Sequence, residues 1–291
     1  MLCALGSNNG ELFVRKRLSS MLLASAVALS SLVGASGAAL PVDEPVDNAN
    51  ERIARAAADY WGEHPQDYVG LAREIRAHGG DSVSFAVEGH GAVTAHKAQQ
   101  LYDQSVRDRE NDGQRSGQAG VLDVPADSFN VTGSWYHVQD QYGEWWSAMG
   151  LWDFRDDYIN GSDPGDASGI AASVPDCWVN DGEYIAAFDY ENNLYEGALI
   201  RQNAGLSSSV YDVDDMTSGF KMLTDHGLHV LSFKRYSSGC ATEPMQARYY
   251  YEHNQDGSGS WSFSINLAIF ALSYSAGEPA TLQKATEVFH T

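Results

Sequence analysis

The residues best suited to chemistry lie within one aromatic stretch, Phe129 to Phe154. His137, Asp140 and Glu144 supply an imidazole and two carboxylates, and four of the chain's seven tryptophans accompany them. An aromatic surface beside a carboxylate is compatible with binding or cleaving sugars, and paired carboxylates are what a glycoside hydrolase requires. The same residue types are equally ordinary in a turn and a β core. The chain also lacks a GxSxG elbow, so the sequence does not predict catalysis.

At a period of two residues, this stretch predicts two strands joined by a turn over Gln139 to Gly143. The second strand is apolar on both faces. One face carries Trp145, Met149 and Leu151, and the other carries Trp146, Ala148, Trp152 and Phe154. Such a strand is either central in a layered fold or exposes an aromatic face for binding. We expect the first face to be core, and the residues retained as ligand-binding candidates are Trp146, Trp152, Tyr136 and Glu144.

The sequence predicts no cofactor, and its metal signals are weak. His226 and His229 lie three residues apart on an expected strand, which places them on opposite faces and argues against joint zinc binding. Acidic loops offer oxygen ligands of the kind that calcium prefers, although their spacing does not match an EF-hand. The calcium candidates are Asp163, Asp166, Asp212 and Asp214.

The N-terminus has the pattern of a secretory signal peptide over residues 1–38. The basic run Val14 to Arg17 precedes an apolar stretch, Leu18 to Val33, and then small residues that suit cleavage after Ala38. The apolar stretch is short for a bilayer span, so we expect no stable membrane segment after cleavage. The predicted localisation is therefore extracellular.

Secretion gives the cysteines and sequons a meaning. Cys3 is lost with the leader, which leaves Cys177 and Cys240 as an even pair, and we expect them to form a disulfide. The rival interpretation is a catalytic cysteine paired with a histidine. Asn130 and Asn160 head N-glycosylation sequons and are candidates for modification.

The charge excludes one class of partner and suggests an environment. The net charge is -21, and only five of the residues are lysines. A surface of this kind repels itself in dilute buffer and is screened at high salt, which favours a halophilic protein over an ordinary acidic secreted one. Binding to nucleic acid is not expected, because phosphate recognition needs basic clusters.

The chain is predicted to be mainly β, with a C-terminal antiparallel β-sandwich preceded by a small helix-rich region. Residues 39–106 should hold helices capped by Asn48 and Thr94, a helix beginning at Pro65, and a strand from Ser82 to Glu88. This region is a propeptide, an interaction module, or a helical layer on the larger domain. Residues 107–120 are polar and predict an exposed linker and a domain boundary.

Residues 121–276 show almost only strand patterns and form the expected sandwich. Besides the aromatic pair, residues 183–190 should turn back through 194–200, and residues 245–253 should form a hairpin with 260–268. Residues 277–291 are expected to be a weakly ordered tail.

Three functions remain open. The leading hypothesis is a non-enzymatic secreted protein that binds a glycan, an adhesion target or its own copies. The second is a toxin or bacteriocin-like protein with a cleavable N-terminal region. The third is a secreted glycan- or peptide-cleaving hydrolase.

Overall fold

The computed structural model describes residues 48–113, 127–156, 158, 165–195, 199–214, 217–218, 221–239, 244–254, 261–265, 270–274 and 281–291. The chain divides into Met1–Pro45 and Val46–Thr291, and everything described belongs to the second unit. The predicted signal peptide lies outside the described residues.

Helices α1 (Ala49–Glu63) and α2 (Tyr68–Ala77) begin at side-chain caps. The backbone N–H of Glu51 donates to Asn48 Oδ1 at 2.9 Å, which confirms the predicted cap. The second helix begins at Tyr68 rather than Pro65, because Asp67 accepts the hydrogen bond from Gly70 N–H at 2.8 Å. Gly79, with φ of 97°, follows α2 in the left-handed conformation that favours glycine at a helix end.

Helix α3 (Ala95–Gly113) is longer than the sequence predicted. It takes up the first half of the expected linker at 107–120, and the second half lies outside the described residues. No glycine or proline interrupts 95–112, and polar pairs four residues apart support the helix. In one of them, Gln104 Nε2 donates to Asp108 Oδ1 at 2.7 Å.

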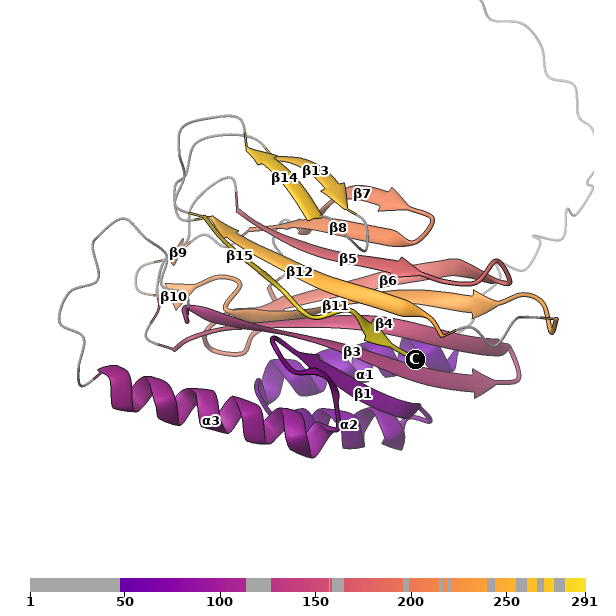
Figure 1. The fold of residues 1–291 in the computed structure, drawn as a ribbon, viewed down its shortest axis with the longest axis horizontal. Helices are drawn as coiled ribbons and strands as arrows, with labels where there is room; N and C mark the ends of the chain where they lie inside the picture. The colour runs from indigo at the N-terminus through magenta and orange to yellow at the C-terminus, as the bar shows by residue number, and fades with distance from the viewer. Residues whose placement is uncertain are drawn as a thin grey trace, which may run out of the picture. The chain divides into compact units, whose positions relative to one another are not determined.

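The strands form two antiparallel sheets (Figure 1). The first sheet has the order β2-β1-β3-β4-β11-β6, and the second has the order β15-β12-β5-β8-β7, with β16 also paired to β12. The strands of the first sheet are β1 (Asp81–Val87), β2 (Gly91–Val93), β3 (Phe129–Asp140), β4 (Gly143–Phe154), β6 (Trp178–Phe188) and β11 (His226–Arg235). Those of the second are β5 (Asp166–Ser173), β7 (Leu199–Gly205), β8 (Ser208–Val213), β12 (Gln246–Asn254), β15 (Thr281–Ala285) and β16 (Phe289–His290). Two small ribbons complete the set: β9 (Thr217–Ser218) with β10 (Lys221–Met222), and β13 (Trp261–Ile265) with β14 (Phe270–Tyr274).

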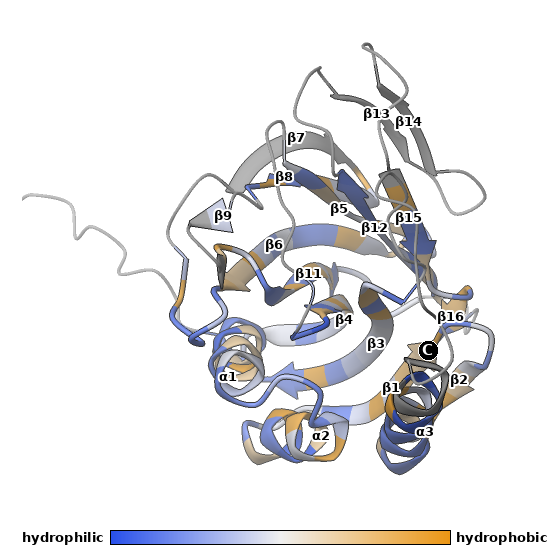
Figure 2. Cartoon of the chain, turned by 90° about the vertical axis from the view of Figure 1, so that its left-hand side faces the viewer, coloured by the Kyte–Doolittle hydropathy of each residue, from blue (hydrophilic) through white to orange (hydrophobic). Residues whose placement is uncertain are grey.

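These elements stack as three layers, with the helices on one face of the first sheet and the second sheet on its other face (Figure 2). Two hydrophobic cores result. The first lies between the helices and the first sheet and includes Trp61, Trp145 and Met149. The second lies between the sheets and includes Trp152 and Tyr251, whose rings stack at 5.3 Å. The mainly β class and the sandwich are therefore confirmed.

The first half of the expected linker, residues 107–113, is helical, and the regions on its two sides share one sheet. Strand β1 pairs with β3, with Phe85 opposite Ser134, so the N-terminal region supplies part of the first sheet. Contacts through α1, α2 and α3 bury one face of that sheet. Of the three interpretations of residues 39–106, the structure agrees with the helical layer on the larger domain.

Several strand pairings also differ from the sequence prediction. Strand β6 pairs with β11 rather than with residues 194–200, apart from one bridge between Phe188 and Leu194. Strand β12 pairs with β5, and β13 pairs with β14. The predicted tail contributes β15 and β16, which pair with β12. Turn signals identify where the chain reverses, but they do not specify which distant strand completes a sheet.

At one point of contact between the two sheets, a glycine faces an aromatic ring. A Cβ atom at Gly150 of β4 would overlap the ring of Tyr249 on β12. Both residues belong to interior strands of their sheets, so the spacing between the sheets depends on residue 150 having no Cβ atom.

Gly150→Ala should therefore destabilise the protein by about 1–3 kcal/mol, because the sheets must separate or Tyr249 must leave its rotamer. Urea unfolding followed by tryptophan fluorescence measures this change. Gly239→Ala is the matched control, since its nearest atom would be Ser237 Oγ at 3.8 Å. Equal stability of the two variants would contradict the close packing.

A chain that begins at residue 121 should not fold alone, because it lacks β1 and the helices that bury Trp145 and Met149. Calorimetry is expected to show no cooperative transition for it, whereas a chain that begins at Val46 should melt cooperatively. A cooperative melt of residues 121–291 would show that the N-terminal region is dispensable.

Candidate functional site

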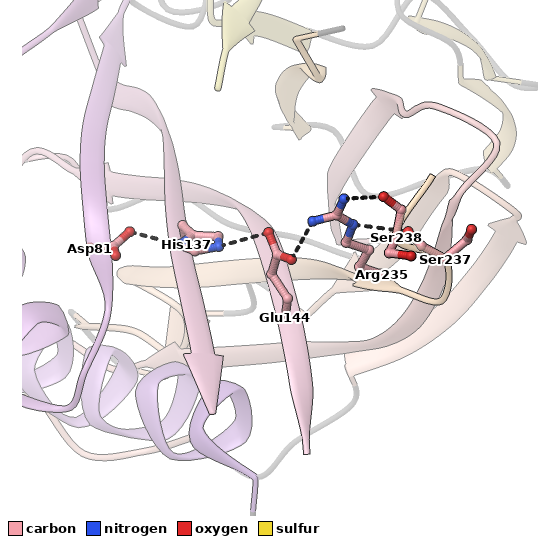
Figure 3. Close-up of polar contacts among 6 residues, drawn as sticks. All are labelled: Asp81, His137, Glu144, Arg235, Ser237 and Ser238. Carbon is pink, nitrogen blue, oxygen red and sulfur yellow. Dashed lines mark hydrogen bonds and ion pairs between the residues drawn. The ribbon is translucent and has the colours of Figure 1, made fainter. Parts of the chain in front are cut away.

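Four charged or titratable side chains form a continuous series of hydrogen bonds and ion pairs across four neighbouring strands, at one end of the first sheet (Figure 3). His137 Nδ1 lies 2.8 Å from Asp81 Oδ1, and His137 Nε2 lies 3.3 Å from Glu144 Oε1. Arg235 Nη1 donates to Glu144 Oε2 at 2.8 Å. We call these residues, together with Trp146, the charged rim.

Strand register brings the charged rim together. Asp81 is opposite His137, and His137 is opposite Trp146, so these positions share one face of the sheet. On β4, Glu144 lies two residues before Trp146. On β11, Phe233 pairs with Trp146, and Arg235 lies two residues after Phe233. The rim is therefore the outer end of the face that forms the second core.

Backbone carbonyls hold the cationic end of the rim. Arg235 donates through Nε to Ser237 O at 3.0 Å and through Nη2 to Ser238 O at 3.2 Å. The side chains of His137, Glu144 and Arg235 are 17%, 23% and 31% exposed. Each group is thus fixed by partners but still reaches solvent.

Trp146 gives the rim an aromatic surface. Its ring lies 4.8 Å from His137 and meets Trp135 edge-on at 6.3 Å, and the residue is only partly buried. Two exposed tyrosines flank the same end of the sheet: Tyr142, in the β3–β4 turn, and Tyr236, after β11, are 49% and 63% exposed. An indole beside fixed hydrogen-bonding groups can bind a polar ligand that has an apolar face.

Two of the four candidates for ligand contact are buried in the cores. Trp152 is fully buried against Tyr251, and Tyr136 is fully buried with its hydroxyl donating to Asn50 Oδ1 at 3.2 Å. Both side chains are core because helices and the second sheet cover the two faces of the hairpin. Trp146 and Glu144 do lie together on the rim. Sequence patterns did not identify Asp81 or Arg235, because both are distant in the chain from their partners.

Two of the predicted calcium ligands, Asp166 and Asp214, are hydrogen-bonded to other side chains. Asp166 is fully buried, and its carboxylate accepts hydrogen bonds from Tyr251 Oη at 2.8 Å and from Asn254 N–H at 2.9 Å. Its Oδ1 also lies 2.9 Å from His253 Nδ1. Tyr195 Oη donates to Asp214 at 3.1 Å. No group of three or more His, Cys, Asp or Glu suited to a metal occurs among the described residues, and Asp163 lies outside them.

His226 and His229 face opposite layers, as their spacing predicted. His226 Nε2 lies 3.2 Å from Gly62 O in the helical layer. His229 lies between the sheets, 2.9 Å from Ser209 Oγ, and burial lowers its pKa to about 3. It therefore stays neutral in the physiological range and serves as a hydrogen-bonding core residue.

The predicted disulfide and glycans remain predictions. Cys177 is buried, and its carbonyl accepts a hydrogen bond from Tyr236 N–H at 3.0 Å. This brings Cys177 beside the strand that leads to Cys240, which itself lies outside the described residues. Asn130 is partly buried on β3, and Asn160 is not described.

Comparisons with known proteins add little to this geometry. No protein-family model and no curated protein match the chain. Among solved structures the chain is similar to AvmM, which catalyses macrocyclization in alchivemycin A biosynthesis. The two share 10% sequence identity and a TM-score of 0.24, over 56% of this chain and 88% of that one. A likeness this low assigns neither a family nor an activity.

Glu252, on β12 of the second sheet, is a buried carboxyl with an altered acidity. Burial, and to a lesser degree the charge of Asp166, raises the pKa of Glu252 to about 7. The folded state therefore binds a proton that the unfolded chain releases near its ordinary pKa. The stabilisation is complete below the unfolded pKa and is lost as the pH rises through about 7.

Glu252→Gln should accordingly gain stability relative to the parent protein as the pH rises from 5 to 8, by on the order of 1–3 kcal/mol. Urea unfolding at both pH values and constant salt measures the difference. Glu63→Gln, at an exposed position in α1, is the control and should show no such trend. A difference independent of pH would contradict the raised pKa.

Proposed function

We propose that this chain is a secreted, acidic, salt-adapted β-sandwich protein that binds an extracellular or cell-surface partner through the charged rim, without catalysing a reaction. The observation that carries the proposal is the position of Trp146 within a chain of fixed polar groups. The partner chemistry that fits best is a neutral glycan, because a sugar has an apolar face for the indole and hydroxyls for Glu144, His137 and Arg235.

The order of the rim supports binding, because its groups are positioned before a ligand arrives. Asp81 and Glu144 hold His137, and Arg235 is held in turn by Glu144 and two carbonyls. A ligand then pays little to order these side chains, which is the main benefit of preorganisation. Both oxygens of Glu144 are engaged, which suits a fixed acceptor better than a proton donor in hydrolysis.

The toxin alternative receives less support. It requires that residues 49–106 separate from the rest of the chain, yet β1 is hydrogen-bonded to β3. Removal of residues 49–106 would also expose buried Tyr136 and Trp145 on the helical face of the sheet.

Trp146→Ala should weaken binding to a neutral cell-envelope polysaccharide by about tenfold or more, as expected for an aromatic residue central to a binding surface. The full chain is tested by surface plasmon resonance against a panel of immobilised neutral polysaccharides in molar NaCl. Tyr190→Ala removes a 47% exposed aromatic at the opposite end of β6 and is the control.

Unchanged binding by Trp146→Ala would show that the charged rim is not the binding surface. Turnover of the same polysaccharides by the parent protein would replace the proposal with the hydrolase alternative.

A further inference from the structure

A cavity of about 220 Å³ lies between α2, α3 and the start of β3, on the helical side of the first sheet. A single water molecule needs a cavity of only about 10–15 Å³, so this cavity has room for a small organic molecule. Residues of the β1–β2 hairpin close one side of it. None of the residues of the charged rim lines it.

The wall of the cavity combines an apolar part with a few polar groups. Val87, Leu101 and Val131 supply alkyl surface. The carboxylate of Glu88 and the imidazole of His90 belong to exposed residues, and the described residues that line the cavity include no lysine or arginine. An anionic ligand would therefore meet the carboxylate of Glu88, because the cations nearest the wall, Lys284 beside Glu88 and Arg109 beside Tyr102, lie outside the lining.

Two tyrosines form the aromatic part of the wall. The rings of Tyr68 and Tyr102 lie 6.0 Å apart at an angle of 60°. Tyr68 is held by a hydrogen bond between its hydroxyl and Thr132 Oγ1 at 3.1 Å, and by an edge contact with Phe85 at 5.6 Å. Aromatic rings beside a carboxylate are the chemistry that recognises organic ammonium groups.

The protein already places one ammonium near this carboxylate. Lys284 Nζ lies 3.7 Å from Glu88 Oε2 and 5.3 Å from the centre of the Phe129 ring. Lys284 itself does not line the cavity. Glu88 thus lies between the ammonium of Lys284 and the cavity. Lys284 and a cationic ligand in the cavity would therefore compete for the carboxylate of Glu88.

We propose that the cavity binds a small organic ammonium ion, with its cationic head beside Glu88 and the tyrosine rings and its alkyl part against Val87 and Leu101. The net charge of -21 draws cations toward the protein as a whole, and the cavity selects among them by aromatic and apolar contact. This site is separate from the rim and does not depend on the function proposed for it.

The test compares choline with 3,3-dimethyl-1-butanol, its uncharged carbon isostere, on the full chain by isothermal titration calorimetry. The two molecules have nearly the same shape, so a difference reports the charge. Choline should bind at least about fivefold more tightly, as a cation–π contact in a partly desolvated site predicts.

Variants on the two sides of Glu88 should have opposite effects. Glu88→Gln should weaken choline binding by about three- to tenfold, and Tyr102→Leu should weaken it by a similar factor. Lys284→Met removes the competing ammonium and should strengthen binding by about two- to fivefold. Glu74→Gln removes a carboxylate from α2 that does not line the cavity, and should leave binding unchanged.

Near-UV circular dichroism confirms that each variant retains its fold before titration. Equal affinity for choline and its isostere would overturn the proposal, and so would the absence of binding by either. An effect of Glu74→Gln as large as that of Glu88→Gln would show only a general charge effect and would also overturn it.

Discussion

The structure depends on the burial of the β3–β4 hairpin on both faces. Trp145, Met149 and Leu151 pack under the helices, while Ala148, Trp152 and Phe154 pack against the second sheet. A strand with alternating large apolar side chains cannot leave either face in water, since each buried side chain of this size contributes about 1.5–3 kcal/mol. The helical layer and the second sheet are therefore both required by one segment.

Buried polar groups fix how the three layers align. Asn50 of α1 donates to Ser232 Oγ at 2.9 Å and accepts from Ser147 Oγ at 2.7 Å and from Tyr136 Oη. Apolar packing alone would tolerate sliding of a helix over the sheet. A buried amide that is hydrogen-bonded on both its nitrogen and its oxygen does not, because a shift would break these bonds and leave buried polar groups unpaired. On the other face, His229 performs the same role through Ser168 and Ser209.

Local patterns predicted what depends on near neighbours in the chain. The cap at Asn48, the two faces of residues 145–154 and the opposite directions of His226 and His229 all follow from periodicity or from contacts within four residues. The pairing of distant strands does not. Asp81 and His137 are 56 residues apart, and Glu144 and Arg235 are 91 apart, so no window of sequence contains the rim. Tyr136 and Trp152 were candidates only because alternation identifies a face without saying which layer covers it.

The same double burial decides where the molecule can act. With both faces of the first sheet occupied over most of its area, binding surfaces remain where the layers part, at the ends of the strands. The charged rim is at the end of β3 that holds His137, and the cavity is at the end that holds Asn130. Seven residues of extended chain separate these positions, which at a rise of about 3.4 Å per residue is about 24 Å. That distance exceeds the screening length of about 8 Å at physiological ionic strength, so the two sites should act independently and should become still more independent at high salt.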